Sequence, residues 1–527
     1  MPPTPRSSLA CLAVALSTVL ATLAAAPAPA APPAQQLTQQ PTQAKASPAA
    51  KGSRPNIVLI TTDDQADHEL REMPRTMRLL ARKGVEFTRA ISPHPLCCPA
   101  RAEILTGTYA HNNGVKHNTG RYGGYDRFAT YRDGRNLRQN IGVWLRDRGY
   151  RTALVGKMLN GYERDSPRPR GWTRWDPAFN DVYSYRDVRF GNDGRPRRTR
   201  GYVTDVIAQR ANVWIRDAAT RDKPFFTWIS HVAPHDGTRG GRFIGRPIPA
   251  DRHRDDFGRA RLPAAGKPSF NEKDVSDKPA AVRRAEPLDR GDLTAMYRDR
   301  LRSLAAVDEA NAATIRVLSK AGVLDETLVV FTSDNGYLFG EHRLKGKNEV
   351  YEENLQVPLV LRGPGIPRDE RTTAQATLID VTATVLDAAG AYDGLAKRRR
   401  VDGVSLLDRL PGATGDAVAH DTALVQAGTA NKKAVKKKEG WLFRGVRTGR
   451  YTYTRRWDGA AELYDRREDP HELRNLLHPD KGRLRRGASA YVDVLRALKQ
   501  RYRALKDCRG PSQCQPDLKP LPPVRES

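Results

Sequence analysis

The chain has 527 residues, of which 89 are Lys or Arg and 60 are Asp or Glu, so its formal net charge is +29. Hydrophobic residues make up 39% and charged residues 28%, a composition typical of a globular protein. The sequence has no Gly-X-Y period, no sustained heptad and only five cysteines, which excludes collagen, coiled coils and disulfide-rich miniproteins. Its one long apolar run is at the N-terminus, which excludes a polytopic membrane protein.

Residues 1–30 have the features of a signal peptide. A short basic start precedes the apolar run Leu9–Ala26, and small residues suited to cleavage follow it. An uncleaved membrane anchor is the alternative interpretation. Residues 31–53, rich in Ala, Pro, Gln and Thr, are expected to form a low-complexity linker. We therefore expect a secreted protein with no stable membrane insertion after signal cleavage.

Four apolar runs in the next part of the chain end abruptly in polar residues. They are Asn56–Ile60, Thr152–Val155, Phe225–Ile229 and Thr327–Phe331. Runs this apolar are typical of strands buried on both faces of a parallel sheet, and helical patterns lie between them. The alternation predicts an α/β fold over residues 54–390, a large doubly wound, mostly parallel sheet sandwiched by helices. Ligands bind at the carboxyl ends of such strands, so we expect the polar residues there to meet.

The C-terminal part of the sequence has a different pattern of apolar and polar residues. Residues 391–507 are expected to form a smaller α+β domain, with a strand over 445–453 and an amphipathic helix over 486–507. Cys508 and Cys514 flank a segment short enough to close as a local disulfide in an oxidising compartment. Residues 508–527 are thus expected to be a disulfide loop and tail.

The excess positive charge has two interpretations, a solvated basic surface or an anionic partner. Basic clusters occur at 397–400 and 432–438, in expected loops. Nucleic acid is not expected, because the protein is predicted to be exported and no motif interleaves aromatic residues with these clusters. An anionic polysaccharide is the better candidate. Residues 236–290 lack periodicity and are expected to be disordered or a functional surface loop beside the site.

The adjacent Cys97 and Cys98 need another explanation, because no further cysteine remains to pair with them. Pro99 suits the first turn of a helix, so Cys97 should lie just before the helix start, where N–H groups and the macrodipole favour an anion. Arg101 can reach back toward this cysteine, which is therefore expected to be reactive. The spacing does not match the Cys-x5-Arg of tyrosine phosphatases, and no second Cys or His pair has the spacing of a zinc site.

The motif Cys97-x-Pro99-x-Arg101, followed by Leu105-Thr106-Gly107, resembles the signature of the formylglycine-dependent sulfatases of the alkaline phosphatase superfamily. The resemblance extends from Pro55 to about Leu477. It implies an alkaline phosphatase-like fold and oxidation of Cys97 to formylglycine (3-oxoalanine) by a formylglycine-generating enzyme. It also implies hydrolysis of a sulfate ester through a formylglycine gem-diol nucleophile.

The same resemblance implies a metal site. Its ligands would be Asp63, Asp64, Asp334, Asn335 and the modified Cys97. An all-oxygen cage of this kind suits a hard cation such as Ca²⁺ better than Zn²⁺. The alternatives are a helix-capping pair for the first two residues and an ordinary turn for the second two.

Lys157, His235 and Lys347 match the sulfate-binding and leaving-group residues of the family. Cations aimed at a sulfate ester stabilise the charge that spreads in its transition state. The family commonly places a His two residues after the first of these lysines, as the base for sulfate elimination, but this chain has Leu159 there. His111 is the nearest substitute, and a purely structural histidine is its alternative interpretation.

Three motifs resemble the N-acetylglucosamine-6-sulfatase and heparan endosulfatase group. They are Cys97-Cys98-Pro99, Tyr109-x-His111-Asn112 and Lys157-x-Leu159-Asn160. This implies sulfated glucosamine, glycosaminoglycan-type sugars or aryl sulfates as substrates. Two alternatives remain: a formylglycine-dependent phosphonate monoester hydrolase or phosphodiesterase on the same fold, and a non-catalytic protein that binds sulfated glycans.

Overall fold

The computed structural model describes residues 54–192, 195–412 and 421–525, and the predicted signal peptide and linker lie outside these ranges. A ten-stranded sheet has the order β15-β2-β14-β11-β1-β8-β4-β5-β6-β7. Its strands are β1 (Asn56–Thr62), β2 (Val85–Phe87), β4 (Arg151–Lys157), β5 (Arg174–Ala178), β6 (Arg189–Asn192), β7 (Arg195–Arg198), β8 (Phe225–Ser230), β11 (Thr327–Ser333), β14 (Leu359–Arg362) and β15 (Glu370–Thr372). The neighbours β11, β1, β8, β4 and β5 run parallel, which confirms the predicted sheet type.

The register of these strands brings their carboxyl ends to one edge. Thr62 of β1 pairs with Ser333 of β11, and Thr61 pairs with Ser230 of β8. Ser230 in turn pairs with Gly156 of β4. The residues that follow the four predicted strands therefore lie side by side, as expected for a doubly wound sheet.

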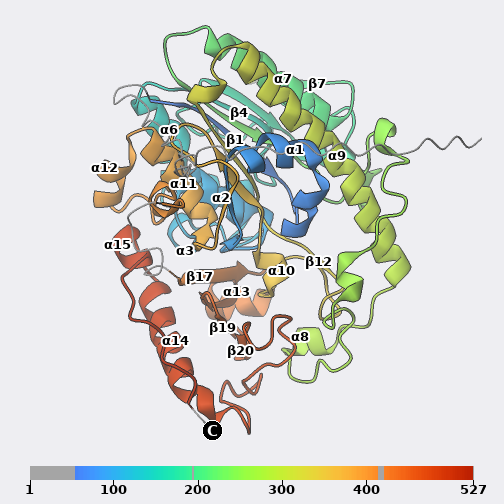
Figure 1. The fold of residues 1–527 in the computed structure, drawn as a ribbon, viewed down its shortest axis with the longest axis vertical. Coiled ribbons are helices and arrows are strands. Elements are labelled where there is room, and N and C mark those ends of the chain that lie inside the picture. Colours follow the sequence, from blue (N-terminus) through green and yellow to red (C-terminus); the bar gives the residue numbers. More distant parts are fainter. Residues whose placement is uncertain (1–53, 193–194, 413–420, 526–527) are drawn as a thin grey trace, which may run out of the picture. The chain divides into compact units, whose positions relative to one another are not determined.

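Helices cover both faces of the sheet (Figure 1). One face carries α7 (Val203–Ala219) and α9 (Arg290–Lys320), and the other carries α2 (Cys97–Thr106), α6 (Ile141–Asp147) and α11 (Leu378–Ala388). Successive residues of β1 alternate between the two cores: Val58 and Ile60 pack on the α7 and α9 side, Ile57 and Leu59 on the other. This two-sided burial explains why the strand is apolar without interruption.

Shorter elements connect these layers. The remaining helices before residue 400 are α1 (Pro74–Leu79), α3 (Ala110–Asn113), α4 (Gly124–Thr130), α5 (Arg135–Arg138), α8 (Ala280–Arg283), α10 (Glu352–Leu355) and α12 (Tyr392–Lys397). Three short strand pairs are β3 (Ala90–Ile91) with β16 (Ala376–Thr377), β9 (Thr238–Arg239) with β10 (Arg242–Phe243), and β12 (Leu338–Phe339) with β13 (Lys345–Gly346). The stretch 236–290 is irregular but holds β9, β10 and α8, so it is a structured loop region.

Short 3-10 helices complete the described elements. They are Asp67–Glu72, Ala81–Lys83, Asn180–Ser184, Asp251–His253, Pro263–Gly266, Leu324–Glu326, Leu407–Arg409 and Ser489–Tyr491. Among all the helices in the described ranges, none is both long enough and apolar enough to cross a membrane.

The C-terminal part forms a separate four-stranded antiparallel sheet. Its strands are β17 (Ala423–Gly428), β18 (Trp441–Arg447), β19 (Tyr451–Arg456) and β20 (Ala461–Asp465), and its helices are α13 (Lys432–Lys438), α14 (Val492–Leu505) and α15 (Pro511–Cys514). The smaller α+β architecture is as predicted, and Cys508 and Cys514 form the expected disulfide. The predicted domain boundary at residue 390 stays a prediction, because residues 54–525 belong to one compact unit.

The single strand predicted over 445–453 is wrong. The alternating pattern there spans the end of β18 and the start of β19, which form a hairpin. The side chain of Thr448 accepts hydrogen bonds from the backbone N–H groups of Arg450 and Tyr451, and this turns the chain back. The amphipathic helix predicted over 486–507 is present but shorter, as α14.

Candidate active site

Two acidic segments interlock at the carboxyl edge of the sheet. Asp63 and Asp64 follow β1 directly, and Asp334 and Asn335 follow β11. The backbone N–H of Asp64 donates to Oδ1 of Asp334 at 3.0 Å, and the N–H of Asp334 donates to the carbonyl of Thr62 at 3.2 Å. Asp64 has φ of 71°, a conformation uncommon for residues other than glycine, and it turns the carboxylate toward its neighbours.

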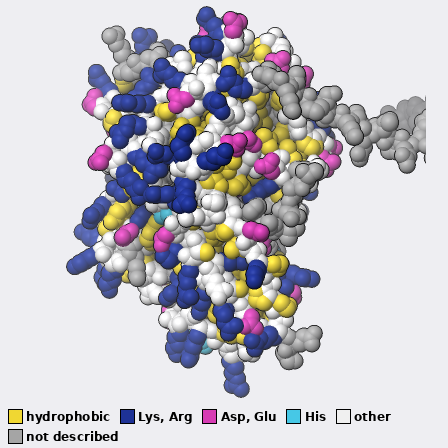
Figure 2. All heavy atoms as spheres, turned by 90° about the vertical axis from the view of Figure 1, so that its left-hand side faces the viewer, with side chains coloured by type: hydrophobic (Ala, Val, Ile, Leu, Met, Phe, Trp, Pro, Cys, Tyr) yellow, Lys and Arg dark blue, Asp and Glu magenta, His cyan; other side chains and the backbone are white. Residues whose placement is uncertain are grey.

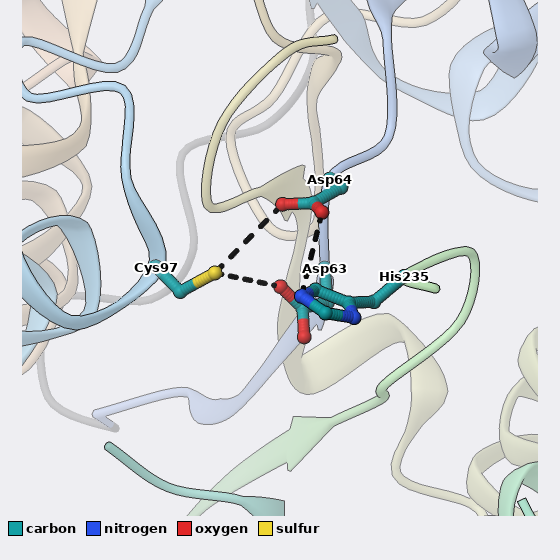
Figure 3. Close-up of side chains that lie close together, drawn as sticks. All are labelled: Asp63, Asp64, Cys97 and His235. Carbon is teal, nitrogen blue, oxygen red and sulfur yellow. Dashed lines mark hydrogen bonds and ion pairs between the residues drawn. The ribbon is translucent and has the colours of Figure 1, made fainter. Parts of the chain in front are cut away.

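Cys97 projects into this acidic pair. Helix α2 begins at Cys97 itself, slightly earlier than predicted, and Pro99 lies in its first turn. The thiol Sγ is 3.3 Å from Oδ1 of Asp63 and 3.8 Å from Oδ1 of Asp64 (Figure 3). Together with His235, these three residues each offer a ligand atom within 4.8 Å of one another.

The pKa of the Cys97 thiol is set by its burial and its charged neighbours. Burial, and then the charge of Asp63, raise the pKa of Cys97 well above its ordinary value. The two nearby lysines act in the opposite direction but do not reverse the shift. A raised pKa favours the thiol over the thiolate, and the distinguishing feature of this fully buried residue is its position among ligand groups.

Two lysine side chains balance the negative charge of the Asp63 and Asp64 carboxylates. Nζ of Lys157 forms an ion pair with Asp63, and Nζ of Lys347 lies 2.7 Å from Oδ2 of Asp64 and 2.8 Å from Sγ of Cys97. Burial alone would raise the pKa of Asp63, yet Lys157, His235 and Arg101 hold it well below its ordinary value. The cluster thus keeps an ionised carboxylate beside two ammonium groups in a buried place.

The ring of His235 has a defined orientation. Its Nδ1 lies 2.8 Å from the carbonyl oxygen of Asp236, which can only accept, so Nδ1 carries the proton. Its Nε2 lies 3.7 Å from Oδ2 of Asp64 and faces the cluster. Burial, and then Lys347, lower the pKa of the ring, so Nε2 is the acceptor end of a neutral imidazole.

The hydrogen bonds of Arg101 go to other residues of the cluster, and its Nη2 lies 3.9 Å from Oδ1 of Asp63, which is next to Cys97. Its Nε donates to Oδ2 of Asp334 at 2.8 Å, and its Nη1 donates to the carbonyl of Lys157 and to Oγ of Ser230. The side chain is 1% exposed. Arg101 therefore holds the carboxylate of Asp334 and the end of β4 in place beside Asp63 and Cys97.

The arrangement fits a hard divalent cation. Oδ1 of Asn335 is buried and has no hydrogen-bond partner, while its Nδ2 donates to Asp64 at 2.8 Å. Burial, and then the charge of Asp63, raise the pKa of Asp334 to about 7. An unpartnered amide oxygen beside three crowded carboxylates is a set of oxygen donors that a bound cation would satisfy.

His111 is not brought to this cluster. Its Nε2 is 2.8 Å from the carbonyl oxygen of Cys508, its Nδ1 faces the side chain of Gln426 at 3.0 Å, and its ring stacks on Tyr109. Both ring nitrogens are thus engaged by the C-terminal part, and the proposed role as a base gains no support. Leu159 is buried and belongs to the hydrophobic core that also contains residues of α2 and α6.

Two aromatic residues of the site were not predicted from the sequence. The ring of Tyr183 lies 4.6 Å from that of His235 and 5.0 Å from Nζ of Lys157. Phe243 of β10 lies 5.4 Å from Tyr183 and 5.8 Å from His235, and it is 59% exposed. Tyr183 lies in a short 3-10 helix and Phe243 in a two-residue strand, so no periodic pattern or motif marks them.

A buried ion pair next to the site was also not predicted from the sequence. Arg300 of α9 donates to both carboxylate oxygens of Glu69 at 2.7 Å, and both side chains are 0% exposed. The same guanidinium donates to the carbonyl oxygens of Asp64 and Pro234. Arg300 therefore ties the loop after β1 to the residue that precedes His235.

Glu69→Ala should lower the free energy of unfolding by about 3–5 kcal/mol, because it leaves a buried guanidinium without its counter-ion. Urea denaturation of the purified protein measures this loss. Glu309→Ala is the matched control, since Glu309 pairs with Arg252 in a partly exposed place and should cost about 0–1 kcal/mol. Equal losses in the free energy of unfolding of Glu69→Ala and Glu309→Ala would contradict the prediction that the buried ion pair stabilises the fold more than the partly exposed one.

Comparison with known proteins identifies the family. The sulfatase family model matches residues 55–391, and the model described as N-sulphoglucosamine sulphohydrolase, C-terminal, matches residues 340–502. An arylsulfatase of Volvox carteri is 32% identical over 506 residues, covering 86% of this chain and 76% of the relative. An N-acetylglucosamine-6-sulfatase of Homo sapiens is 31% identical over 386 residues, covering 69% of this chain and 66% of the relative.

Solved structures agree on the fold. A structure determined in complex with its substrate D-glucosamine-2-N,6-O-disulfate has a TM-score of 0.65 and 24% identity, and the match covers 85% of this chain and 96% of that one. A phosphonate monoester hydrolase from Silicibacter pomeroyi has a TM-score of 0.57 and 21% identity, covering 85% and 94% of the two chains.

The chain belongs to the sulfatase family and is an enzyme that hydrolyses sulfate esters. Within that family, the predicted resemblance to the N-acetylglucosamine-6-sulfatase branch is confirmed.

Proposed function

We propose that this sulfatase releases inorganic sulfate from sulfated sugars of the glucosamine or glycosaminoglycan type, using one Ca²⁺ and a formylglycine formed from Cys97. The observation that carries the proposal is the position of Cys97. Its Sγ lies between the carboxylates of Asp63 and Asp64 and the ammonium group of Lys347, at the first residue of a ten-residue helix. That is where an oxygen nucleophile, a cation and a sulfate would have to meet.

Asp63, Asp64, Asp334 and Asn335 are the residues that would hold Ca²⁺. The unpartnered Oδ1 of Asn335 and the crowding of the three carboxylates support this assignment. When bound, Ca²⁺ supplies positive charge beside residue 97 and the substrate sulfate. The carboxylates also keep Lys157 and Lys347 in fixed positions through their ion pairs.

Formylglycine at position 97, when formed by its generating enzyme, supplies a hydrated aldehyde with one hydroxyl for attack on sulfur and a second for sulfate elimination. Lys157 and Lys347 bind the sulfate oxygens and stabilise the charge that spreads over them as the ester bond breaks. The neutral ring of His235 can take up a proton at Nε2, because its Nδ1–H is engaged by Asp236, and can then pass that proton to the leaving oxygen. His235 is the histidine of the cluster, so it is also our candidate to accept the proton released during sulfate elimination. It would take the role that the family commonly gives to a His at the position of Leu159, and for which His111 was the predicted substitute.

An aromatic ring at the site supports a sugar as the organic part of the substrate. Phe243 lies beside His235 and is one of two exposed large hydrophobic side chains in the described residues. An exposed ring in a polar site offers a flat apolar surface, and the C–H face of a pyranose can pack on it.

Phe243→Ala should raise KM for D-glucosamine-6-sulfate by about 3–10-fold, the equivalent of one lost aromatic contact, with little change in kcat. Steady-state kinetics measure this, and Phe243→Tyr should keep the wild-type KM. Val213→Ala is the matched control, because Val213 is the other exposed large hydrophobic residue. An equal KM for all four proteins would remove Phe243 from the substrate site.

Secretion is part of the same proposal. The signal-peptide pattern of residues 1–30 and the disulfide between Cys508 and Cys514 both support an oxidising, extracytoplasmic compartment.

A substrate panel tests the reaction class. The Ca²⁺-loaded, formylglycine-containing enzyme is given D-glucosamine-6-sulfate, an aryl sulfate and an aryl phosphonate monoester, and product release is measured. We expect kcat/KM for the sulfate esters to exceed that for the phosphonate. Faster hydrolysis of the phosphonate would favour the phosphonate hydrolase alternative. Glycan binding without turnover of any ester would favour the non-catalytic binder.

A further inference from the structure

A basic groove lies at the amino edge of the central sheet, opposite the edge that carries the active site. Three connections line it, 146–151, 168–173 and 220–223. They lead into β4, β5 and β8, which are neighbours in the sheet. The groove has a volume of about 1430 Å³. We call it the amino-edge groove.

Positive charge dominates the amino-edge groove. Its cations are Arg146, Arg151, Arg168, Arg170, Arg221 and Lys223, and its one acidic lining residue is Asp222. Arg151 and Arg221 share the carboxylate of Asp217, which lies outside the lining, each at 2.9 Å. Figure 2 shows one face of the molecule, on which Lys and Arg are far more frequent than Asp and Glu.

Three of these cations have no counter-ion. Arg146, Arg170 and Lys223 are exposed, and among the described residues none of them has a carboxylate within ion-pair distance. Holding three like charges in one concavity without an ion-paired carboxylate is unfavourable unless an anion joins them. The groove is therefore shaped and charged to take a polyanion.

The lining argues for a sulfated glycan over nucleic acid or a membrane. Guanidinium groups bind sulfate with two parallel hydrogen bonds, so an arginine-rich groove suits it. The aromatic residues Tyr150 and Trp172 are each 3% exposed, so no ring is available for base stacking. The exposed large hydrophobic residues of the described part, Val213 and Phe243, lie outside the groove, so nothing there would insert into lipid.

The groove is too far from residue 97 to be part of the active site. Strand β4 runs from Arg151 at the groove to Lys157 at the site, a length of about 20 Å. We propose that the amino-edge groove is a second, non-catalytic binding site for a sulfated polysaccharide, which holds the polymer while another part of it is hydrolysed. The choice of a sulfated polymer rests on the proposed function, whereas the binding of a polyanion does not.

The test compares two charge-reversed variants of the full mature chain, each with the same change in net charge. The groove variant is Arg146→Glu, Arg170→Glu and Lys223→Glu. The control variant is Arg259→Glu, Arg290→Glu and Lys481→Glu, at exposed basic residues outside the groove. If the groove variant does not reach the wild-type melting temperature, the corresponding triple Gln variant replaces it. Binding of fluorescent dextran sulfate is measured against unsulfated dextran.

At about 0.15 M NaCl we expect the groove variant to bind dextran sulfate at least about tenfold more weakly than the control variant. The slope of log Kd against log salt should fall by about two to three, one for each lost contact. Unsulfated dextran should bind none of the proteins. Sulfate release from D-glucosamine-6-sulfate should be the same in both variants, since the groove does not touch the site.

Equal losses of dextran sulfate binding in the two variants would overturn the proposal, because net charge alone would then explain the binding. Single-stranded DNA that binds as tightly, with the same loss in the groove variant, would also overturn it and leave a general polyanion site. The binding result does not depend on turnover. A failure of the proposed sulfatase reaction and a failure of the groove are therefore distinguishable.

Discussion

Cys97→Ser should lose nearly all sulfate release, with kcat lower by at least about a thousandfold. A serine at this position offers one hydroxyl, and after one attack on sulfur it has no second hydroxyl from which sulfate could be eliminated. The variant should therefore end as a stable sulfate ester of residue 97. Stopped assays of sulfate release, together with the intact mass of the protein after exposure to substrate, measure both effects.

Cys98→Ser is the matched control for this substitution. The neighbouring thiol is also buried, and its Sγ accepts a hydrogen bond from the backbone N–H of Asn160 at 3.1 Å. A serine there keeps an acceptor and leaves the Cys97-x-Pro99-x-Arg101 motif intact. We expect activity within about tenfold of wild type. If the two variants lost activity equally, residue 97 would have no special role.

Asp334→Asn should weaken Ca²⁺ binding by at least about 100-fold and lower kcat/KM by at least the same factor. The substitution removes one carboxylate from the cluster and also removes the charge that pairs with Arg101 at 2.8 Å. Calorimetric titration with Ca²⁺ measures the affinity. In the wild type, removal of Ca²⁺ by a chelator should lower the free energy of unfolding by about 3 kcal/mol relative to protein held at 100 times Kd.

Asp402→Asn controls for the loss of any buried carboxylate. Asp402 is 0% exposed and accepts hydrogen bonds from Tyr109 and Asn112, outside the cluster. Its substitution should lower stability but leave Ca²⁺ affinity unchanged. Unchanged Ca²⁺ affinity in Asp334→Asn would contradict the metal assignment.

The fold was predictable where burial is two-sided. The run Asn56–Ile60 is apolar throughout because its residues alternate between two cores, and the polar residues after it then lie at the carboxyl edge. The hairpin at Thr448 was not predictable from the alternation alone. Strands β18 and β19 keep the same two-residue period on either side of the turn, so the pattern reads as one strand.

The site was predictable where its residues stand in a motif or directly after a strand. Asp63, Lys157 and Asp334 meet these conditions, and the structure brings them together. Tyr183 and Arg300 do not, because their contacts join segments far apart in the chain and leave no local pattern. Burial is equally invisible in a single sequence. The raised pKa of the Cys97 thiol, which follows mainly from burial, could therefore not be predicted.

The central claim is that residue 97 acts as formylglycine, and the mass of the tryptic peptide 90–101 tests it most directly. The peptide is taken from protein made in a host that contains a formylglycine-generating enzyme, and fragmentation separates position 97 from position 98. We predict the mass of an aldehyde in place of the thiol at position 97, together with reaction toward a carbonyl probe. An unmodified Cys97 in protein that still releases sulfate would contradict the account.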